Sequence, residues 1–270
     1  MVEPEVTYLD RILAAHRAQA AADSRDLAEL ADLAAGATPA RGFVAGLRGV
    51  AGIAVIAEIK RRSPKKGDLD SRLDPTVVAR EYEEGGAAAL SVLTDEAFFG
   101  GSVADLMTAR AATSLPVLRK DFTVSAADVY DARVMGADAV LLIAAALSDA
   151  ELPVLHELVV SLGMDALVEV HDEAEVGRAV ALGATLVGVN QRDLITFAVD
   201  TARAERVAAA IPAGVVRVAE SGIDGPAAVA RLVAAGYEAV LVGETLMRSQ
   251  DRAAAVAALR TAAVGAAASS

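Results

Sequence analysis

Short apolar runs recur along this chain, each long enough for one buried strand and followed by charged or small residues. In the first of them, Ala54-Val-Ile-Ala57 leads directly into Glu58 and Lys60. Continuous apolar runs of this length predict strands buried on both faces, as in a parallel sheet. Glu58 and Lys60 are two residues apart, so on a strand their side chains point to the same side. An acid and an amine at the end of a buried strand indicate a candidate reaction site.

Four further runs share one form, in which a helix-ending glycine and a short link precede a buried strand. They begin at Gly86, Gly136, Gly183 and Gly236, which are 50, 47 and 53 residues apart. About fifty residues is too long for one strand–helix unit and right for two. The missing strands are predicted in the intervals, at residues 116–120, 166–170 and 215–220.

Together with the first strand, the pattern predicts eight strands that alternate with helices. Eight parallel strands with right-handed crossovers close into an α/β (βα)8 TIM barrel. A doubly wound open sheet is the alternative, but no glycine-rich dinucleotide turn follows the first strand. Apolar residues at helical spacing before the first strand predict an N-terminal helical extension over 1–50, with a loosely attached tail as the alternative. We expect the barrel over 51–262 and a frayed C-terminal tail over 263–270.

Composition narrows the classes of function. The net charge is −12, which argues against a nucleic-acid partner because such a partner favours a basic face. The chain has no cysteine, which excludes disulfides and a Cys nucleophile and suits a reducing cytoplasm. The longest apolar run, residues 139–147, is too short to span a bilayer, and no metal-binding motif occurs. We expect a cytoplasmic monomer with no metal, cofactor or membrane partner.

Charged and polar side chains stand where the predicted strands end. In a barrel these ends surround the catalytic mouth. The residues at these positions are Glu58, Lys60, Lys120, Glu169, Asn190 and Glu220. Neighbouring carboxylates keep a lysine protonated, which suits a lysine that donates a proton to a carbonyl or a departing hydroxyl. A structural ring of ion pairs is the alternative, and the number of strands that contribute favours a reaction site. His171 follows the fifth strand and is expected to hydrogen-bond within its loop, whereas His16 and His156 are expected at the surface or in packing.

The loops after the seventh and eighth strands place small residues where backbone amides can approach a ligand. Ser221 and Gly222 lie in one loop, and Gly243 and Glu244 in the other. Barrels often bind phosphate here, at the start of a short helix, and Ser63 in the first loop adds a hydroxyl. After the second strand, Phe98-Phe99-Gly100-Gly101-Ser102 either walls an aromatic pocket or packs in the core.

Several longer motifs connect these features. They are Ile56-Ala-Glu-Ile-Lys60 with Ser63-Pro64, Ser91-Val-Leu-Thr94 with Phe98-Phe-Gly-Gly-Ser102, Pro116-Val-Leu-Arg-Lys-Asp-Phe122, Gly136-Ala-Asp-Ala-Val-Leu-Leu-Ile143, Leu167-Val-Glu-Val-His171, Gly188-Val-Asn190 with Arg192, Ala219-Glu-Ser-Gly-Ile223 and Leu241-Val-Gly-Glu244. With them the sequence resembles the indole-3-glycerol-phosphate synthase family of tryptophan biosynthesis over nearly all of residues 7–250. The resemblance implies a carboxy-lyase that closes the indole ring of 1-(2-carboxyphenylamino)-1-deoxyribulose 5-phosphate without a cofactor.

The resemblance also implies roles for individual residues. Lys120 is the general acid of ring closure, and Lys60 holds the substrate carboxylate and protonates the departing hydroxyl. Either Glu169 or Glu58 accepts a proton. Two further sets follow from the family: Glu220, Asn190 and Arg192 orient the lysines and the sugar hydroxyls, and Phe99, Phe122, Pro64 and Leu141 form the slot for the anthranilate ring. The phosphate is assigned to Ser63, Ser221, Gly222, Gly243 and the backbone amide of Glu244.

One departure from the family pattern lies in the first loop. The family usually has Ser-Pro-Ser-Lys-Gly there, and this chain has Ser63-Pro64-Lys65-Lys66-Gly67. The extra lysine either strengthens phosphate steering or alters how the loop closes. Two other classes of function stay open: another phosphosugar barrel enzyme, such as a Schiff-base aldolase that uses Lys120, and a non-catalytic protein that binds phosphoanthranilates.

Overall fold

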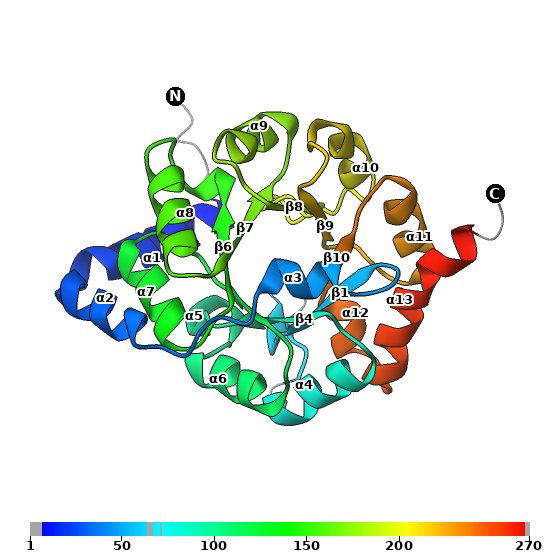
Figure 1. Cartoon of the computed structure of the whole chain (residues 1–270), viewed down its shortest axis with the longest axis horizontal. Coiled ribbons are helices and arrows are strands. Elements are labelled where there is room, and N and C mark those ends of the chain that lie inside the picture. The colour runs from blue at the N-terminus through cyan, green and yellow to red at the C-terminus, as the bar shows by residue number, and fades with distance from the viewer. Residues whose placement is uncertain (1–6, 64–66, 71, 268–270) are drawn as a thin grey trace.

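The structure is a computed structural model that describes residues 7–63, 67–70 and 72–267, with Ser63 and residues 263–267 described as backbone alone. Eight parallel strands close into a barrel in the order β1-β10-β9-β8-β7-β6-β5-β4 (Figure 1). The strands are β1 (Ala54–Ile59), β4 (Ala89–Leu93), β5 (Val117–Lys120), β6 (Ala139–Ile143), β7 (Asp165–Val170), β8 (Leu186–Asn190), β9 (Val216–Glu220) and β10 (Ala239–Val242). The predicted (βα)8 TIM barrel is confirmed.

Helices follow the strands and surround the barrel. They are α4 (Pro75–Glu84), α5 (Glu96–Phe99), α6 (Val103–Ala112), α7 (Ala126–Val134), α8 (Glu151–Ser161), α9 (Glu173–Ala181), α10 (Arg203–Val207), α11 (Pro226–Ala234), α12 (Glu244–Met247) and α13 (Arg252–Ala267), with the short 3-10 helices η1 (Ala144–Ala146) and η2 (Ala208–Ala210). Within the described part of the chain, no helix has the length and apolarity to cross a membrane.

Two apolar cores explain why the strands read as continuous apolar runs. Successive side chains of a strand point to opposite faces. On β1, Val55 and Ala57 belong to the core between strands and outer helices, whereas Ala54 and Ile56 belong to the core inside the barrel. Both faces are therefore buried, and hydrophobic burial favours β-branched and small aliphatic residues at every position.

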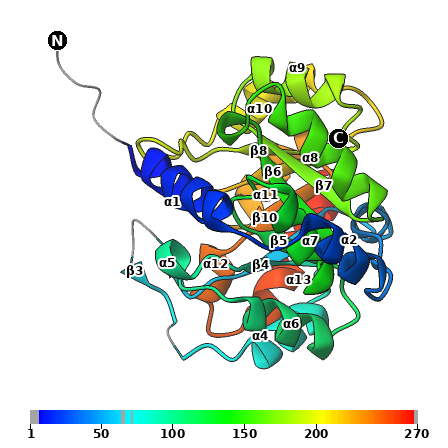
Figure 2. The ribbon, with the colours of Figure 1, turned by 90° about the vertical axis from the view of Figure 1, so that its left-hand side faces the viewer.

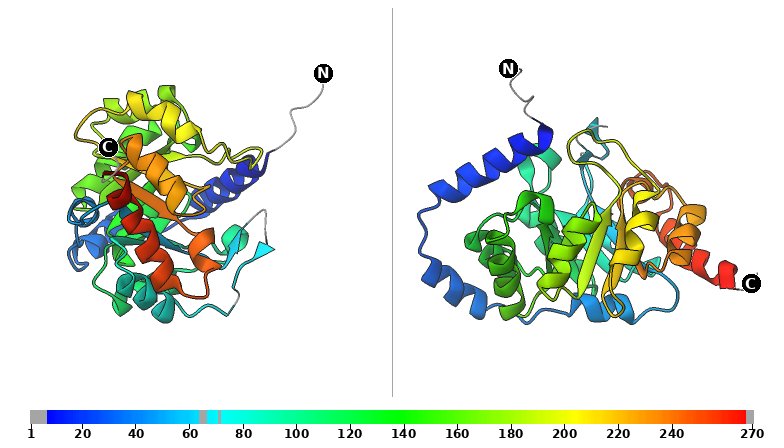
Figure 3. Two further views of the ribbon diagram at one scale, coloured as in Figure 1. Left: turned by 90° about the vertical axis from the view of Figure 1, so that its right-hand side faces the viewer. Right: turned by 90° about the horizontal axis from the view of Figure 1, so that it is seen from above.

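The N-terminal segment contains α1 (Tyr8–Ala22), α2 (Leu27–Ala35) and α3 (Phe43–Arg48). Figure 3 shows α1 and α3 at opposite ends of the barrel, with the segment between them running down its side. Phe43 and Leu47 of α3 are buried in the inner core, so α3 closes the end at which the strands begin. Sequence periodicity indicated only two helices here, because six residues are too few to show a helical repeat.

Two further segments differ from the sequence expectations. A small hairpin, β2 (Arg62–Ser63) and β3 (Gly67–Asp68), lies in the loop after β1. Helix α13 continues to Ala267, into the segment expected as a frayed tail over 263–270. Its alanine-rich sequence has high helix propensity, which explains the extension. Residues 268–270 lie outside the described part of the chain.

Asp138 connects the N-terminal segment to the barrel. Its carboxylate is fully buried and accepts hydrogen bonds from the backbone N–H groups of Arg41, at 2.9 Å, and Val117, at 2.8 Å. It also pairs with Arg110 at 3.0 Å. Three segments far apart in the sequence therefore share one buried charge.

We expect Asp138→Ala to lower the free energy of unfolding by about 3–5 kcal/mol, because it leaves a partly buried guanidinium and two amides without their acceptor. Urea unfolding measures the change. Asp149→Ala is the control, since Asp149 also pairs with an arginine but its side chain is 92% exposed, and this variant should match the parent. Equal midpoints for both variants would contradict the role of Asp138.

Candidate active site

A cavity of about 510 Å³ opens at the end of the barrel where the strands finish. Nearly all of the residues singled out from the sequence line it. They are Glu58, Lys60, Phe99, Lys120, Phe122, Leu141, Glu169, Asn190, Arg192, Glu220, Ser221, Gly222, Gly243 and Glu244. The two remaining expectations, on Pro64 and on the side chain of Ser63, lie outside the described residues.

Barrel closure brings together side chains from opposite strands. In the strand order, β5 lies across the barrel from β9. Lys120 at the end of β5 nevertheless reaches Glu220 at the end of β9, with 3.9 Å between Nζ and Oε2. Oε2 of Glu169, the residue before the last in β7, lies 3.4 Å from the same Nζ atom of Lys120. The three charges expected at one mouth therefore meet at its centre.

A glycine in β8 makes room for this arrangement. A Cβ atom on Gly188 would lie 2.1 Å from Oε1 of Glu220. Any side chain at this position would collide with the Glu220 carboxylate and displace it. Packing therefore explains the glycine of the Gly188-Val-Asn190 motif, because the Glu220 carboxylate lies directly against β8.

Lys60 and Asn190 each form a close polar contact with a glutamate of this site. Lys60 Nζ lies 2.6 Å from Glu58 Oε1, so the pair expected from the first strand is formed. Asn190 donates from Nδ2 to Glu169 Oε1 at 3.0 Å, and its own Oδ1 accepts the backbone N–H of Arg192 at 3.0 Å. Asn190 thus holds the Glu169 carboxylate in place from the side away from Lys120.

The lysine at the centre carries a stable positive charge. Burial of the Lys120 ammonium favours its neutral form, but the carboxylates of Glu169, Glu220 and Glu58 outweigh burial and raise its pKa above the ordinary value. Lys120 is therefore an ammonium at neutral pH, as the sequence reasoning required.

The two carboxylates beside Lys120 titrate in opposite directions. For Glu169, burial opposes ionisation, but Lys120, His171 and Asn190 outweigh it and lower the pKa. For Glu220, burial and the negative charge of Glu169 raise the pKa well above its usual range. Glu169 therefore ionises more readily than an ordinary carboxyl group, whereas Glu220 keeps its proton to higher pH.

His171 does more than hydrogen-bond within its loop. Nδ1 lies 3.1 Å from Oε2 of Glu175, which also accepts the His171 backbone N–H at 2.7 Å. On the other side of the ring, Nε2 lies 3.7 Å from Oε1 of Glu169. Burial disfavours the imidazolium, but the hydrogen bond to Glu175 and the charge of Glu169 raise the pKa of His171.

Aromatic rings form one wall of the cavity. The rings of Phe99 and Phe122 lie 6.4 Å apart at an angle of 31°, and Leu141 lines the cavity beside them. Phe98 packs instead against Tyr8 of α1 at 5.8 Å. Of the two alternatives for the Phe98-Phe99 pair, the pocket wall holds for Phe99 and packing holds for Phe98.

The loops after β9 and β10 form another part of the wall. Ser221 has a φ of 64°, a left-handed conformation that is uncommon for a residue other than glycine. Gln191 Nε2 donates to its carbonyl oxygen at 2.8 Å and holds the turn. Thr245 Oγ1 donates to the carbonyl of Ile223 at 2.6 Å, which joins the two loops. The short helix α12 begins at Glu244, and the assignment of phosphate to this turn stays a prediction.

Sequence reasoning missed most of the loop after β8. Leu194, Phe197 and Val199 line the cavity, and the Phe197 ring meets Tyr8 at 5.0 Å. Figure 2 shows this loop reaching the start of α1. An isolated bridge between Arg192 and Val199 shapes it. Loop residues have no periodic pattern, so only Arg192, which belongs to a motif, could be found.

Comparison with known proteins gives consistent matches. The family model described as indole-3-glycerol phosphate synthase matches residues 9–259. A protein of that name from Nocardioides sp. is 58% identical over 196 residues, which are 73% of this chain and 75% of the relative. One from Micrococcus luteus is 54% identical over 193 residues, 72% of each chain.

Solved structures support the fold alone. A 3-hexulose-6-phosphate synthase is similar with a TM-score of 0.60 at 18% identity, and the match covers 78% of this chain and 99% of that one. Thiamine phosphate pyrophosphorylase from Pyrococcus furiosus has a TM-score of 0.59 at 18% identity, with 79% and 96% covered.

The opposite pKa shifts predict opposite pH dependence of stability. Because the pKa of Glu220 is raised, its stabilising form is the protonated one, which is lost as pH rises from about 4.3, the unfolded value, to the folded pKa. Glu220→Gln mimics that form at every pH. The variant should therefore become increasingly more stable than the parent as pH rises from 5 to 8 in urea unfolding.

Glu169→Gln is the matched comparison. The pKa of Glu169 is lowered, so its contribution is present above the unfolded pKa and is lost as pH falls. This variant should be less stable than the parent from pH 8 down to pH 5, with the difference shrinking only below the unfolded pKa of about 4.3. A Glu220→Gln variant that is destabilised equally at all pH values would contradict the assignment.

Proposed function

Because the chain belongs to the indole-3-glycerol phosphate synthase family, we propose that it closes the indole ring of 1-(2-carboxyphenylamino)-1-deoxyribulose 5-phosphate, with loss of carbon dioxide and water. This makes it a carboxy-lyase. The observation that carries the proposal is the buried Lys120 ammonium, which lies between Glu169 and Glu220 at the floor of a cavity with an aromatic wall. The acidic composition and the absence of cysteine support a cytoplasmic monomer that acts on a small phosphorylated substrate, without nucleic acid or membrane.

The cavity walls fit the two ends of this substrate. Phe99, Phe122 and Leu141 come from the side of the barrel that contains β4, β5 and β6, and the turns at Ser221 and Gly243 follow β9 and β10 on the opposite side. The anthranilate ring lies in the aromatic slot and the phosphate at the turns. The ketone in the middle of the chain then lies over Lys120. Holding the ring carbon against the carbonyl lowers the barrier by several kcal/mol, as in other positioned reactions.

Lys120 is the general acid of the first step. The ring carbon that bears the carboxylate attacks the ketone carbon, and the carbonyl oxygen takes a proton from the ammonium. Carbon dioxide then leaves, and its bonding electrons restore the aromatic ring. The raised pKa of Lys120 keeps the proton in place until the developing alkoxide needs it.

The second step expels the new hydroxyl group as water. Lys60, held by Glu58 at 2.6 Å, binds the substrate carboxylate and then donates the proton to the departing hydroxyl. Glu169 accepts the proton that the pyrrole ring loses, since its lowered pKa keeps it ionised at neutral pH. Asn190, Glu220 and Arg192 orient these groups and the sugar hydroxyls. The sequence of steps is redox-neutral and uses no cofactor.

The charge of Lys120 also separates this proposal from a Schiff-base aldolase. A lysine that forms an imine must be neutral when it attacks, which requires a lowered pKa. The pKa of Lys120 is shifted in the other direction.

We expect Lys120→Ala to lower turnover by about 10²–10⁴-fold, the usual contribution of a general acid, while binding of the phosphorylated substrate stays within a few-fold. Indole fluorescence follows turnover, and equilibrium binding to the inactive variant follows affinity. Lys120→Arg is the control, because it keeps the positive charge beside Glu169 but holds its proton, and it should be equally inactive. Turnover of Lys120→Ala within tenfold of the parent would refute the acid role.

We expect Gly243→Ala to weaken phosphate binding. Its methyl group would lie 2.3 Å from Oε1 of Glu58, so that carboxylate and its lysine partner must shift at the mouth. Competitive inhibition by inorganic phosphate should weaken by roughly tenfold, or about 1.4 kcal/mol. Gly177→Ala, where a methyl group meets open space on α9, should leave inhibition unchanged. Equal inhibition constants for the two variants would place the phosphate elsewhere.

A further inference from the structure

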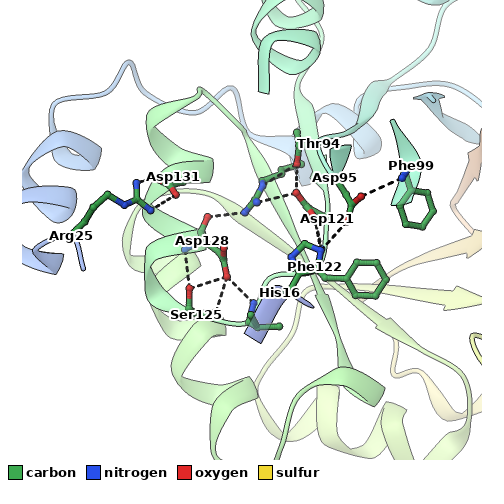
Figure 4. Close-up of polar contacts among 12 residues, drawn as sticks. His16, Arg25, Thr94, Asp95, Phe99, Asp121, Phe122, Ser125, Asp128 and Asp131 are labelled. Carbon is green, nitrogen blue, oxygen red and sulfur yellow. Dashed lines mark hydrogen bonds and ion pairs between the residues drawn. The ribbon is translucent and has the colours of Figure 1, made fainter. Parts of the chain in front are cut away.

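His16 of α1 contacts two residues that line the candidate active site, where the sequence suggested a surface or packing role. Its Nε2 lies 2.8 Å from Oδ2 of Asp95 and 3.8 Å from Oδ1 of Asp121 (Figure 4). The His16 side chain is only 15% exposed, and those of Asp95 and Asp121 are 2% and 5% exposed. A residue of the N-terminal segment thus shares a buried charge cluster with two residues that line the cavity.

Asp95 fixes one ring of the aromatic slot. It follows β4 and caps α5, and its Oδ1 accepts the backbone N–H groups of Phe98 at 2.6 Å and Phe99 at 3.2 Å. Figure 4 shows the bond from Asp95 to Phe99 beside the His16 contact. The Asp95 carboxylate therefore contacts His16 of α1 through Oδ2 and caps the N-terminus of α5, which contains Phe99, through Oδ1.

Asp121 fixes the other ring. It directly follows Lys120 and accepts the backbone N–H of Phe122 at 2.8 Å and a guanidinium N–H of Arg119 at 3.0 Å. The His16 ring itself packs against the Phe122 ring, with centroids 5.6 Å apart. The rings of His16, Phe122 and Phe99 therefore follow one another from α1 into the cavity.

The protein already uses the groups that a metal ion would need. His16, Asp95 and Asp121 have ligand atoms within 4.8 Å of one another. However, the Asp95 oxygens accept hydrogen bonds from His16, Phe98 and Phe99, and the Asp121 oxygens from the Phe122 amide and from Arg119. A metal would have to break the caps that hold the slot, so the arrangement favours a positioning role.

The cluster borders two cavities. Asp95 and Asp121 line the active-site cavity and also a second cavity of about 870 Å³, which His16 lines as well. The acidic groups that face His16 are Asp95, Asp121 and, from α7, Asp128. Burial favours the neutral imidazole, but these carboxylates raise its pKa above the ordinary value, so the ring is charged over a wider pH range.

We propose that His16 is a positioning residue of the active site: through Asp95, Asp121 and the Phe122 ring, it couples the docking of α1 to the shape of the slot between Phe99 and Phe122. The proposal rests on the proposed function in assigning that slot to the substrate's aromatic ring. The charged form of His16 holds both carboxylates. The coupling is therefore present at low pH and is lost as pH rises through the His16 pKa, which lies above its ordinary value.

The kinetic test compares His16→Gln with Arg17→Gln. Arg17 is the next residue on α1 and anchors it through Glu151 at 2.6 Å, but it does not touch the cluster. We expect the KM of the parent to rise as pH passes the His16 pKa. We expect His16→Gln to raise KM about tenfold with kcat within threefold, and to lack that pH-dependent rise. Arg17→Gln should keep both the KM and its pH dependence. If the two variants behave alike, or if His16→Gln keeps the parental pH profile, the proposal is overturned.

A second readout separates this proposal from the proposed function. The chain has no tryptophan, so Phe99→Trp places a single reporter in the slot. Its fluorescence should titrate with pH in an otherwise unchanged chain and in Arg17→Gln, and the transition should vanish in His16→Gln. A reporter that titrates identically in all three backgrounds would refute the coupling. Turnover is measured on the parent chain, which keeps Phe99, and a parent without turnover together with a reporter that follows His16 would refute the synthase assignment alone.

Discussion

The structure depends on the stabilisation of one buried positive charge. An ammonium group that is removed from water is costly, and removing one partner of a buried pair destabilises a protein by about 3–5 kcal/mol. Lys120 is tolerated at the end of β5 because the Glu169 carboxylate lies 3.4 Å from its ammonium, with Glu220 at 3.9 Å. An open sheet would place β5 and β9 far apart. Closure of the barrel therefore completes the polar surroundings of this charge by bringing Glu220 to it.

The same constraint shapes residues that carry no charge. Gly188 lacks a side chain because the Glu220 carboxylate passes over it, and Gly243 lacks one because Glu58 lies beside it. Asn190 holds Glu169 from the side away from Lys120. On the outer rim, Asp95 and Asp121 set the two phenylalanines, and α1 covers them with His16. Contacts made by charged side chains therefore continue from the centre of the barrel to His16 in the N-terminal segment.

The chain pattern predicted the barrel and its charged centre because both are local in sequence. Each strand is an apolar run, and the residue at its end, such as Lys120 or Glu220, is read directly from that run. The pattern did not predict contacts between segments that are far apart in the sequence. The role of His16 depends on contacts between α1 and the residues after β4 and β5, and Phe197 reaches the cavity through a loop without periodicity. Helix α3 escaped notice because its six residues are too short to show a repeat.

The central claim is that Lys120 is a charged proton donor, and its protonation state can be measured directly. The chain has four lysines, Lys60, Lys65, Lys66 and Lys120, so ¹³C-labelled lysine gives few NMR signals, and Lys120→Arg identifies one of them. We predict that the Lys120 signal still reports an ammonium at pH values above 10.4, the ordinary lysine pKa. A Lys120 amine that is already neutral at pH 8 to 9 would contradict the account.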